Sequence, residues 1–383
     1  MSHTTPPLGL RVAPHLAIVS MGYVMFGYAG VPDFYLSQYD IGYTSFGLML
    51  SAILLPLVLA QWPASRLVER TTTTRLLIVA TVAQAGLAST VDFAPTFPTV
   101  LALRFLWGIA AGLVLSVGAT HIARLYSGDA ASRQQGVYGG MLTLGGAFGF
   151  LITPRLVTAT GGIGIHALGT LIAVPAVGAL YRNRHDRLTG PSESASETAG
   201  GSVLTNPVVI LASLCYVAAI GSYLTLSAFI TSYFEDLGVF GPLNALVLGV
   251  ATLGRASGGS VVVRFPVTDP KIIAGASAVA VLGFGTLAAA PAGPLRVVLP
   301  LLVMLAVSLP FGAIYNVAAD ATASEGSALA MVIAIGNLVA LVLPVVTGSI
   351  RDATGGYEGA FLVLVGLNTV AVGSAVLITR TRQ

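Results

Sequence analysis

Two arginines lie within long apolar segments of the sequence, Arg104 and Arg255. A charged side chain inside a bilayer costs about 2.5–3.5 kcal/mol on insertion scales, so it normally faces a cavity or a partner. Arg104 is therefore the first candidate for substrate contact, with a structural tie to Asp33 or to backbone carbonyls as the alternative. Arg255 is a second candidate, although its place near one end of its segment also allows the side chain to reach the membrane surface.

Acidic residues are nearly absent from the apolar segments. Of the 15 Asp and Glu residues, only Asp33 falls within such a segment. If the protein is a carrier, a carboxylate whose pKa is raised by burial is the usual group for coupling to a proton. Asp33 is thus the candidate for coupling, and the proton is the candidate coupling ion. Facilitated diffusion and the exchange of two substrates stay open as alternatives.

The other reactive side chains form no catalytic pattern. Cys215 is the single cysteine and the 5 histidines are scattered, so neither an internal disulfide nor metal-site spacing is present. The sequence also lacks a glycine-rich phosphate loop, a nucleophile elbow and paired carboxylates at catalytic spacing. We therefore expect no enzyme activity, no metal and no cofactor.

Composition indicates the elements that must position these residues. With 55% hydrophobic residues, 9% charged residues and a mean hydropathy of +0.87, the chain has far fewer charges than the roughly 25% of a soluble domain. A helix needs about 20 apolar residues to cross a bilayer, because its backbone polar groups must be paired internally. The sequence predicts an all-α integral membrane protein that lies in a lipid bilayer.

Twelve segments of this kind are predicted, in two sets of six separated by a polar linker. The first half covers residues 1–181, the linker 182–206 and the second half 207–383. The predicted spans are 13–35, 44–64, 76–93, 98–120, 135–157, 163–181, 207–232, 242–263, 271–290, 296–318, 326–348 and 358–379. A weak internal repeat supports two related halves, since Ser65, Arg66 and Arg70 fall opposite Gly259, Ser260 and Arg264 at a fixed offset.

The distribution of positive charge predicts the orientation. If the N-terminus is inside, most of the 18 Lys and Arg residues fall on the inner face, as expected for short cytoplasmic loops. Both termini and the linker are then cytoplasmic. The net charge of +3 reflects this topology, so we expect no nucleic-acid partner. Short loops and a composition rich in arginine and poor in lysine favour a prokaryotic cytoplasmic membrane, and we expect a monomer.

Two sequence patterns resemble a known family. The charged run Ser65-Arg-Leu-Val-Glu-Arg70, closed by Arg75, resembles the Gly-x-Leu-x-Asp-Arg-x-Gly-Arg-Arg loop between helices two and three of the major facilitator superfamily of transporters. Serine replaces the first glycine, glutamate the aspartate and Thr72 the second glycine. The run Arg104-Phe-Leu-Trp-Gly108-Ile-Ala-Ala-Gly112 resembles the fourth-helix pattern Arg-x-x-x-Gly-x-x-x-Gly, whose glycines share one helical face and allow close packing.

Two further patterns match branches of this family only in part. Gly136, Gly145 and Gly149 follow the fifth-helix spacing of the antiporter branch. Phe150 replaces the proline expected next, so we do not infer an antiport mechanism from this resemblance. The run Gly254-Arg255-Ala-Ser-Gly-Gly259 resembles the Arg-x-x-Gly-Gly of nitrate and nitrite porters, in which arginines of helices two and eight hold the anion. Gln61 occupies the position that the internal repeat pairs with Arg255, so one of the two arginines that would hold the anion is absent.

The resemblance implies a central cavity lined by helices one, four, seven and ten. Besides the two arginines, the candidate substrate-binding residues are Tyr23, Tyr28, Tyr223, Asn316 and, in the eleventh span, Asn337. The charged run and its counterpart are expected to gate the cavity, through Ser65, Glu69, Arg70, Arg75 and Arg264. Glu69 stands where the family's acid latches the inner side.

The function implied is that of a secondary active or facilitative transporter, which moves a small solute across the membrane by alternating access. An anionic solute is one alternative, in the manner of a nitrate or nitrite porter, and a drug efflux antiporter of the same fold is another. A non-transporting membrane sensor is the alternative from a different class.

Overall fold

The computed structural model describes residues 6–184, 203–264, 267–322 and 324–381, and the regular elements among them are all helices. In chain order they are α1 (Leu8–Gly27), η1 (Tyr28–Gly30), α2 (Pro32–Tyr39), α3 (Tyr43–Arg70), α4 (Thr73–Val91), α5 (Phe97–Leu125), α6 (Gly128–Thr160), α7 (Ala167–Arg182), α9 (Pro207–Asp236), α10 (Leu243–Arg264), α11 (Asp269–Ala288), α12 (Leu295–Ser308), α13 (Phe311–Ala319), α14 (Glu325–Ala340), α15 (Leu343–Thr354) and α16 (Glu358–Thr381).

Most of these helices have the length and hydropathy of membrane spans. Within the described ranges, 10 helical segments are long and apolar enough to cross a bilayer, and Ala167–Arg182 and Leu243–Ser257 are shorter apolar helices. The two shorter helices correspond to the predicted spans 163–181 and 242–263. The all-α membrane architecture expected from composition is confirmed.

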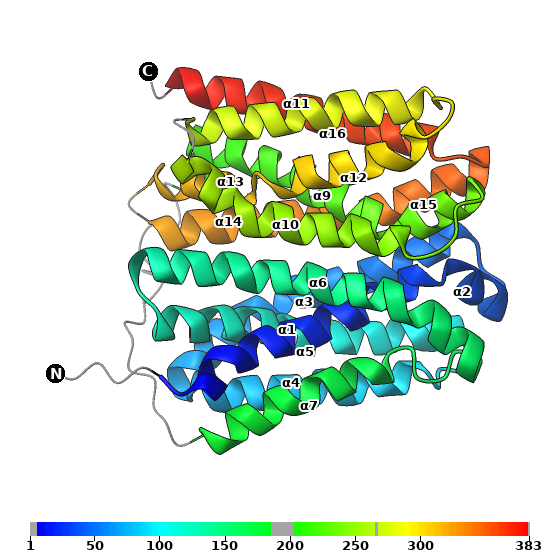
Figure 1. Cartoon of the computed structure of the whole chain (residues 1–383). Helices are drawn as coiled ribbons and strands as arrows, with labels where there is room; N and C mark the ends of the chain where they lie inside the picture. Colours follow the sequence, from blue (N-terminus) through cyan, green and yellow to red (C-terminus); the bar gives the residue numbers. More distant parts are fainter. Residues whose placement is uncertain (1–5, 185–202, 265–266, 323, 382–383) are drawn as a thin grey trace. The chain divides into compact units, whose positions relative to one another are not determined.

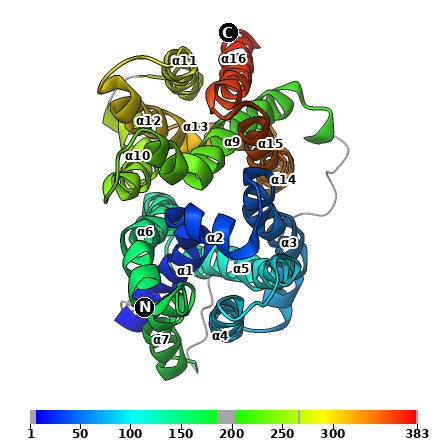
Figure 2. The same ribbon diagram turned by 90° about the vertical axis from the view of Figure 1, so that its right-hand side faces the viewer.

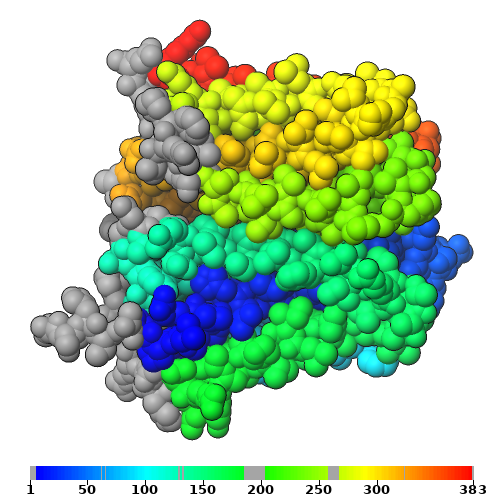
Figure 3. Space-filling model, viewed as in Figure 1, coloured from blue at the N-terminus to red at the C-terminus, as the bar shows by residue number. Residues whose placement is uncertain are grey.

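The chain groups into two compact units. The first comprises the described residues of Met1–Asp40 and Met49–Ser192, and the second those of Ile41–Leu48 and Glu193–Gln383. In the first unit α1 packs against α6 and α7, and α4 packs against α5 and α7 (Figures 1 and 2). In the second unit α9 packs against α14 and α16, while α11 packs against α16 and α12. The N-terminal turns of α1 are visible at the surface between α6 and α7 (Figure 3).

Glycines allow close helix crossings in the first unit. A Cβ atom at Gly108 would lie 2.6 Å from the Ile53 carbonyl oxygen, and one at Gly112 would lie 2.5 Å from that of Leu57, so α5 meets α3 backbone to backbone. A Cβ at Gly149 of α6 would lie 2.9 Å from the Cα of Gly27 in α1. These glycines therefore serve helix packing.

Three predicted spans are not single helices. The span predicted at 13–35 breaks at Val31 (φ −142°, ψ 58°), because Pro32 disfavours helical geometry in the residue before it. The span predicted at 296–318 is divided into α12 and α13 at Pro310, which has no N–H to donate. The span predicted at 326–348 is divided into α14 and α15, and Pro344 lies in the first turn of α15.

The charged run is helical rather than a loop. The span predicted to end at residue 64 continues as α3 to Arg70. Helix α4 begins at Thr73, and the side chain of Thr72 caps it by accepting a hydrogen bond from the Arg75 N–H (3.3 Å). Leucine, glutamate and arginine are good helix formers, which explains why the helix continues beyond the apolar segment. Within the predicted 182–206 linker, residues 185–202 lie outside the described part of the chain.

Candidate functional site

Arg104 lies buried in the first unit, with 1% of its surface exposed, and its hydrogen bonds are directed at the backbone. Nε donates to the Met49 carbonyl oxygen (2.7 Å), and a terminal nitrogen donates to that of Met25 (3.2 Å). The guanidinium also lies over the ring of Tyr28, 4.2 Å from its centroid. Asp33 is exposed in the first turn of α2. Two of the three guanidinium nitrogens of Arg104 are therefore bonded to backbone carbonyl oxygens.

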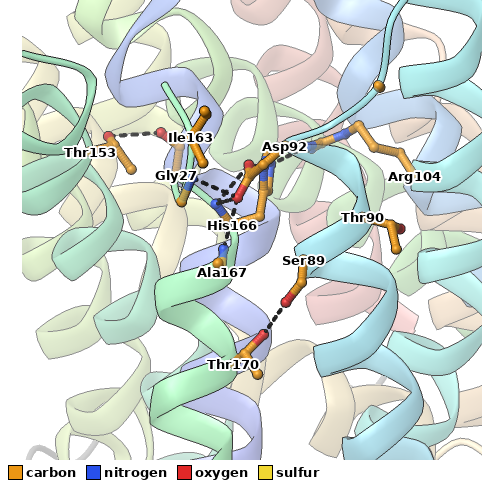
Figure 4. Close-up of polar contacts among 12 residues, drawn as sticks. Gly27, Ser89, Thr90, Asp92, Arg104, Thr153, Ile163, His166, Ala167 and Thr170 are labelled. Atoms are coloured by element: carbon orange, nitrogen blue, oxygen red, sulfur yellow. Dashed lines mark hydrogen bonds and ion pairs between the residues drawn. The ribbon is translucent and has the colours of Figure 1, made fainter. Parts of the chain in front are cut away.

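The remaining terminal nitrogen of Arg104 faces an imidazole. It lies 3.3 Å from Nε2 of His166, whose Nδ1 lies 2.7 Å from Oδ1 of Asp92 (Figure 4). The side chains of Asp92 and His166 are each 1% exposed. Arginine, histidine and aspartate thus form a continuous buried chain from α5 to the ends of α7 and α4.

Asp92 also caps α7. One of its carboxylate oxygens accepts the backbone N–H groups of Gly164 (3.1 Å), His166 (3.0 Å) and Ala167 (3.1 Å). A carboxylate at this place satisfies N–H groups that have no partner within the helix, and its charge is favourable at the positive end of the helix dipole. The cap ties the end of α4 to the beginning of α7.

Tyr23 and Tyr28 flank this network. Both side chains are fully buried. The Tyr23 hydroxyl has no hydrogen-bond partner among the described residues. Of the predicted residues Arg104, Tyr23 and Tyr28, the structure brings Arg104 and Tyr28 into contact. Asp92 and His166 are not among the predicted residues, because they lie in connections between helices.

Arg255 of α10 is held in the second unit by aromatic rings. Its guanidinium carbon lies 4.4 Å from the ring centroid of Tyr223 and 4.3 Å from that of Phe311. Its buried Nε has no hydrogen-bond partner among the described residues. Stacking on rings leaves the N–H groups at the edge of the guanidinium plane available for an anion.

Further polar groups lie beside this stack. Tyr216 and Tyr315 approach each other through their hydroxyl oxygens (3.4 Å), and the side chain of Asn337 interacts with Tyr216. Phe311 is the first residue of α13, directly after the helix break at Pro310. The structure therefore brings the predicted residues Arg255 and Tyr223 into contact, and the predicted Asn337 is linked to them through Tyr216 and Phe311. Predicted Asn316 is exposed on α13, and no hydrogen bond of its side chain is found in the described part of the chain.

The proposed gating residues are surface residues where they are described. Glu69, Arg70 and Arg75 are exposed at the adjoining ends of α3 and α4. The side chains of Ser65 and Arg264 lie outside the described residues. Within the described ranges, no group of three or more His, Cys, Asp or Glu residues is arranged to hold a metal ion.

Comparison with known proteins identifies the family. The sequence model of the Major Facilitator Superfamily matches residues 14–344. The chain belongs to the Major Facilitator Superfamily. It is therefore a transporter, which moves a small solute across a membrane by alternating access between states open to either side. Members of the Major Facilitator Superfamily are transporters rather than enzymes.

Solved structures agree with this family at the level of the fold. A bacterial homologue of the human lysosomal transporter Spinster, in an inward-facing and occupied conformation, superposes with a TM-score of 0.75 at 14% sequence identity, over 98% of this chain and 96% of that chain. The same homologue in an inward-facing and unoccupied conformation gives a TM-score of 0.77 at 14% identity, with the same two coverages. No curated protein matches the chain by sequence.

Proposed function

We propose that the chain transports a small organic anion, whose acidic group binds the edge of Arg255. The observation that carries the proposal is the ring stack itself: Arg255 lies over the rings of Tyr223 and Phe311 with a buried Nε that has no hydrogen-bond partner among the described residues. An arginine that stays within a bilayer normally faces a partner or a cavity. A carboxylate of the solute would supply that partner.

The chemistry of the neighbouring groups favours an organic anion over nitrate. The buried rings of Tyr216, Tyr223 and Phe311 place apolar groups beside the cation, and Tyr315 and Asn337 add hydroxyl and amide groups. Such a set of groups suits a solute with both an acidic and an apolar part. The nitrate-porter clasp, by contrast, uses a second arginine, and Gln61 stands in the corresponding place.

The finer architecture belongs to the same proposal. We infer twelve spans in two six-helix halves, 1–181 and 207–383, joined by a cytoplasmic linker at 182–206. The excess of arginine on one face favours cytoplasmic termini in a prokaryotic cytoplasmic membrane. The protein acts as a monomer.

A ligand screen tests the proposal directly. Purified protein is heated in the presence of small mono- and dicarboxylates, aromatic carboxylates, nitrate and neutral analogues, and the anion that raises the unfolding temperature most is then tested for uptake into proteoliposomes. A hydrogen bond to a charged group contributes about 1.5–3 kcal/mol, so Arg255→Gln should weaken binding by about 10- to 150-fold.

The matched control removes an arginine from the surface. Arg155 is exposed on α6 of the first unit, so Arg155→Gln makes the same chemical change outside the aromatic stack. Uptake and thermal stabilisation should be unchanged in this variant. Equal loss of binding in both variants, or preferential stabilisation by neutral analogues, would exclude Arg255 as the anion-binding group.

A further inference from the structure

The hydrogen-bond donors and acceptors of Arg104, His166 and Asp92 in the first unit define the protonation state of His166. Arginine carries only N–H donors, so Nε2 of His166, 3.3 Å from the Arg104 guanidinium, must act as an acceptor. Nδ1 then carries the hydrogen and donates it to Asp92 at 2.7 Å. The imidazole in this structure is therefore neutral and has its hydrogen on Nδ1. One cation and one anion balance each other across it.

A proton on Nε2 would be incompatible with this arrangement. It would place an N–H against the N–H of Arg104, and two cations would face each other in a buried site. Asp92 would stabilise the imidazolium on its other side through the existing contact. Arg104 would therefore have to leave His166. Because the guanidinium is planar and rigid, it would move as one group, and its bonds to the carbonyl oxygens of Met49 and Met25 would be lengthened or broken at the same time.

Asp92 and His166 form a buried pair. The other groups around this pair leave His166 as its principal site of proton exchange. Asp92 faces it from the end of α4 and Arg104 from α5. The remaining titratable groups near the pair are phenols, which stay neutral at physiological pH. They are Tyr23 of α1, Tyr28 of η1, and Tyr35 and Tyr39 of α2, and they interact with Asp92, with Arg104 or with both. From α6, Thr153 contributes a neutral hydroxyl, bonded to the Gly27 carbonyl oxygen (3.0 Å).

The position of the pair is suited to proton entry from one side of the membrane. Asp92 is the C-terminal cap of α4 and His166 is the N-terminal cap of α7, so both lie at helix ends. Phe93, the residue next to Asp92, is 68% exposed. A small local opening at these ends would therefore admit water to the pair, whereas a site in the middle of the helices would require a larger one.

We propose that His166 is a proton-binding site and that its protonation releases Arg104, which couples transport to the proton. The proton binds Nε2 as Arg104 withdraws, and Asp92 keeps its contact with Nδ1. When the proton leaves, Nε2 again accepts from Arg104. The inference rests on the proposed transport function, but the protonation state and the release of Arg104 can be measured without transport.

Nitrogen NMR tests the site itself. Protein labelled with ¹⁵N in histidine and arginine is placed in lipid nanodiscs, and the His166 signals are assigned by their loss in His166→Gln and in His166→Asn. At pH 8 we expect the neutral imidazole with hydrogen on Nδ1, and on acidification an imidazolium whose appearance coincides with a change in the Arg104 signals. Hydrogen on Nε2 at pH 8, or an unchanged Arg104 signal on protonation, would overturn the proposal.

Transport measurements test the coupling. If His166 binds the coupled proton, the wild-type rate should vary by up to about tenfold per pH unit over one limb of its pH profile. His166→Gln retains an acceptor for Arg104 but binds no proton, so the profile should become flat on that limb. Asp92→Asn retains one oxygen to cap α7 but removes the anion that faces His166, so the pH dependence of transport should differ from that of the wild type.

The control is a second buried histidine. His121 of α5 is also fully buried and bonds Thr73 (3.1 Å) and the Leu10 carbonyl oxygen (3.1 Å), so His121→Gln makes the same change away from Arg104. Its pH profile should match the wild type. A wild-type profile in His166→Gln would exclude coupling at this site. Absence of transport by the wild type would count against the proposed function, and the NMR result would still decide the protonation state.

Discussion

Arg104 and Arg255 are placed in membrane helices in two different ways. The guanidinium of Arg104 is occupied by the carbonyl oxygens of Met25 and Met49 and by His166. That of Arg255 lies over two aromatic rings, and its Nε has no hydrogen-bond partner among the described residues. The donors of Arg104 are thus used within the protein, whereas Arg255 keeps a donor that the proposed anion would use. Residue type and location within a span could not distinguish them.

Arg104→Ala should therefore destabilise the protein. Two buried carbonyl oxygens and His166 would lose a charged donor, which costs about 2–5 kcal/mol. Thermal unfolding in detergent should occur at a clearly lower temperature, whereas Asp33→Asn, which changes an exposed side chain on α2, should leave it unchanged. Equal and non-additive losses in the two variants would instead restore the predicted tie between Arg104 and Asp33.

At the scale of the helices, hydropathy predicted most of the fold. A bilayer requires long apolar helices with internally paired backbones, and the sequence displays them. The breaks at Val31, Pro310 and Val342 were missed because a proline within an apolar run can be tolerated or can end the helix. Asp92 and His166 were missed for another reason: they are 74 positions apart, and only the packing of α4 against α7 brings them together.

The crossing of α3 and α5 gives a prediction for a single methyl group. Gly108→Ala would place Cβ 2.6 Å from the Ile53 carbonyl oxygen and 2.7 Å from Cγ of Pro56, so the helices must separate. We expect a loss of about 1–3 kcal/mol in stability. The matched control is Gly178→Ala in α7, where nothing lies within 4 Å of the added atom. Thermal unfolding of both variants should show destabilisation only for Gly108→Ala.

The orientation of the whole molecule can be measured by cysteine labelling. In a Cys215→Ser background, cysteines replace Leu204, which is 64% exposed before α9, and Phe240, which is 76% exposed after it. If the termini are cytoplasmic, an impermeant reagent added to intact cells should label Phe240→Cys and spare Leu204→Cys. The opposite pattern would reverse the proposed topology.

Glu69 gives the last prediction, because alternating access requires an inner gate that opens and closes. Glu69 is exposed in the last turn of α3, and the helix continues to Arg70, so its carboxylate moves with α3 rather than with a loop. We expect Glu69 to latch the closed inner gate, as in the family pattern that the charged run resembles. Glu69→Gln should then favour the inward-open state and slow transport without changing solute preference.

Distances between spin labels at Ala123 and Thr268, exposed residues near the ends of α5 and α11, report this change, because the two positions fall on the predicted cytoplasmic face of the two halves. The distribution should shift to longer distances in Glu69→Gln. Glu358→Gln removes an exposed acid at the beginning of α16, on the predicted outer face, and should leave the distances unchanged. The same distribution in Glu69→Gln and the wild type would show that this carboxylate only contributes to topology.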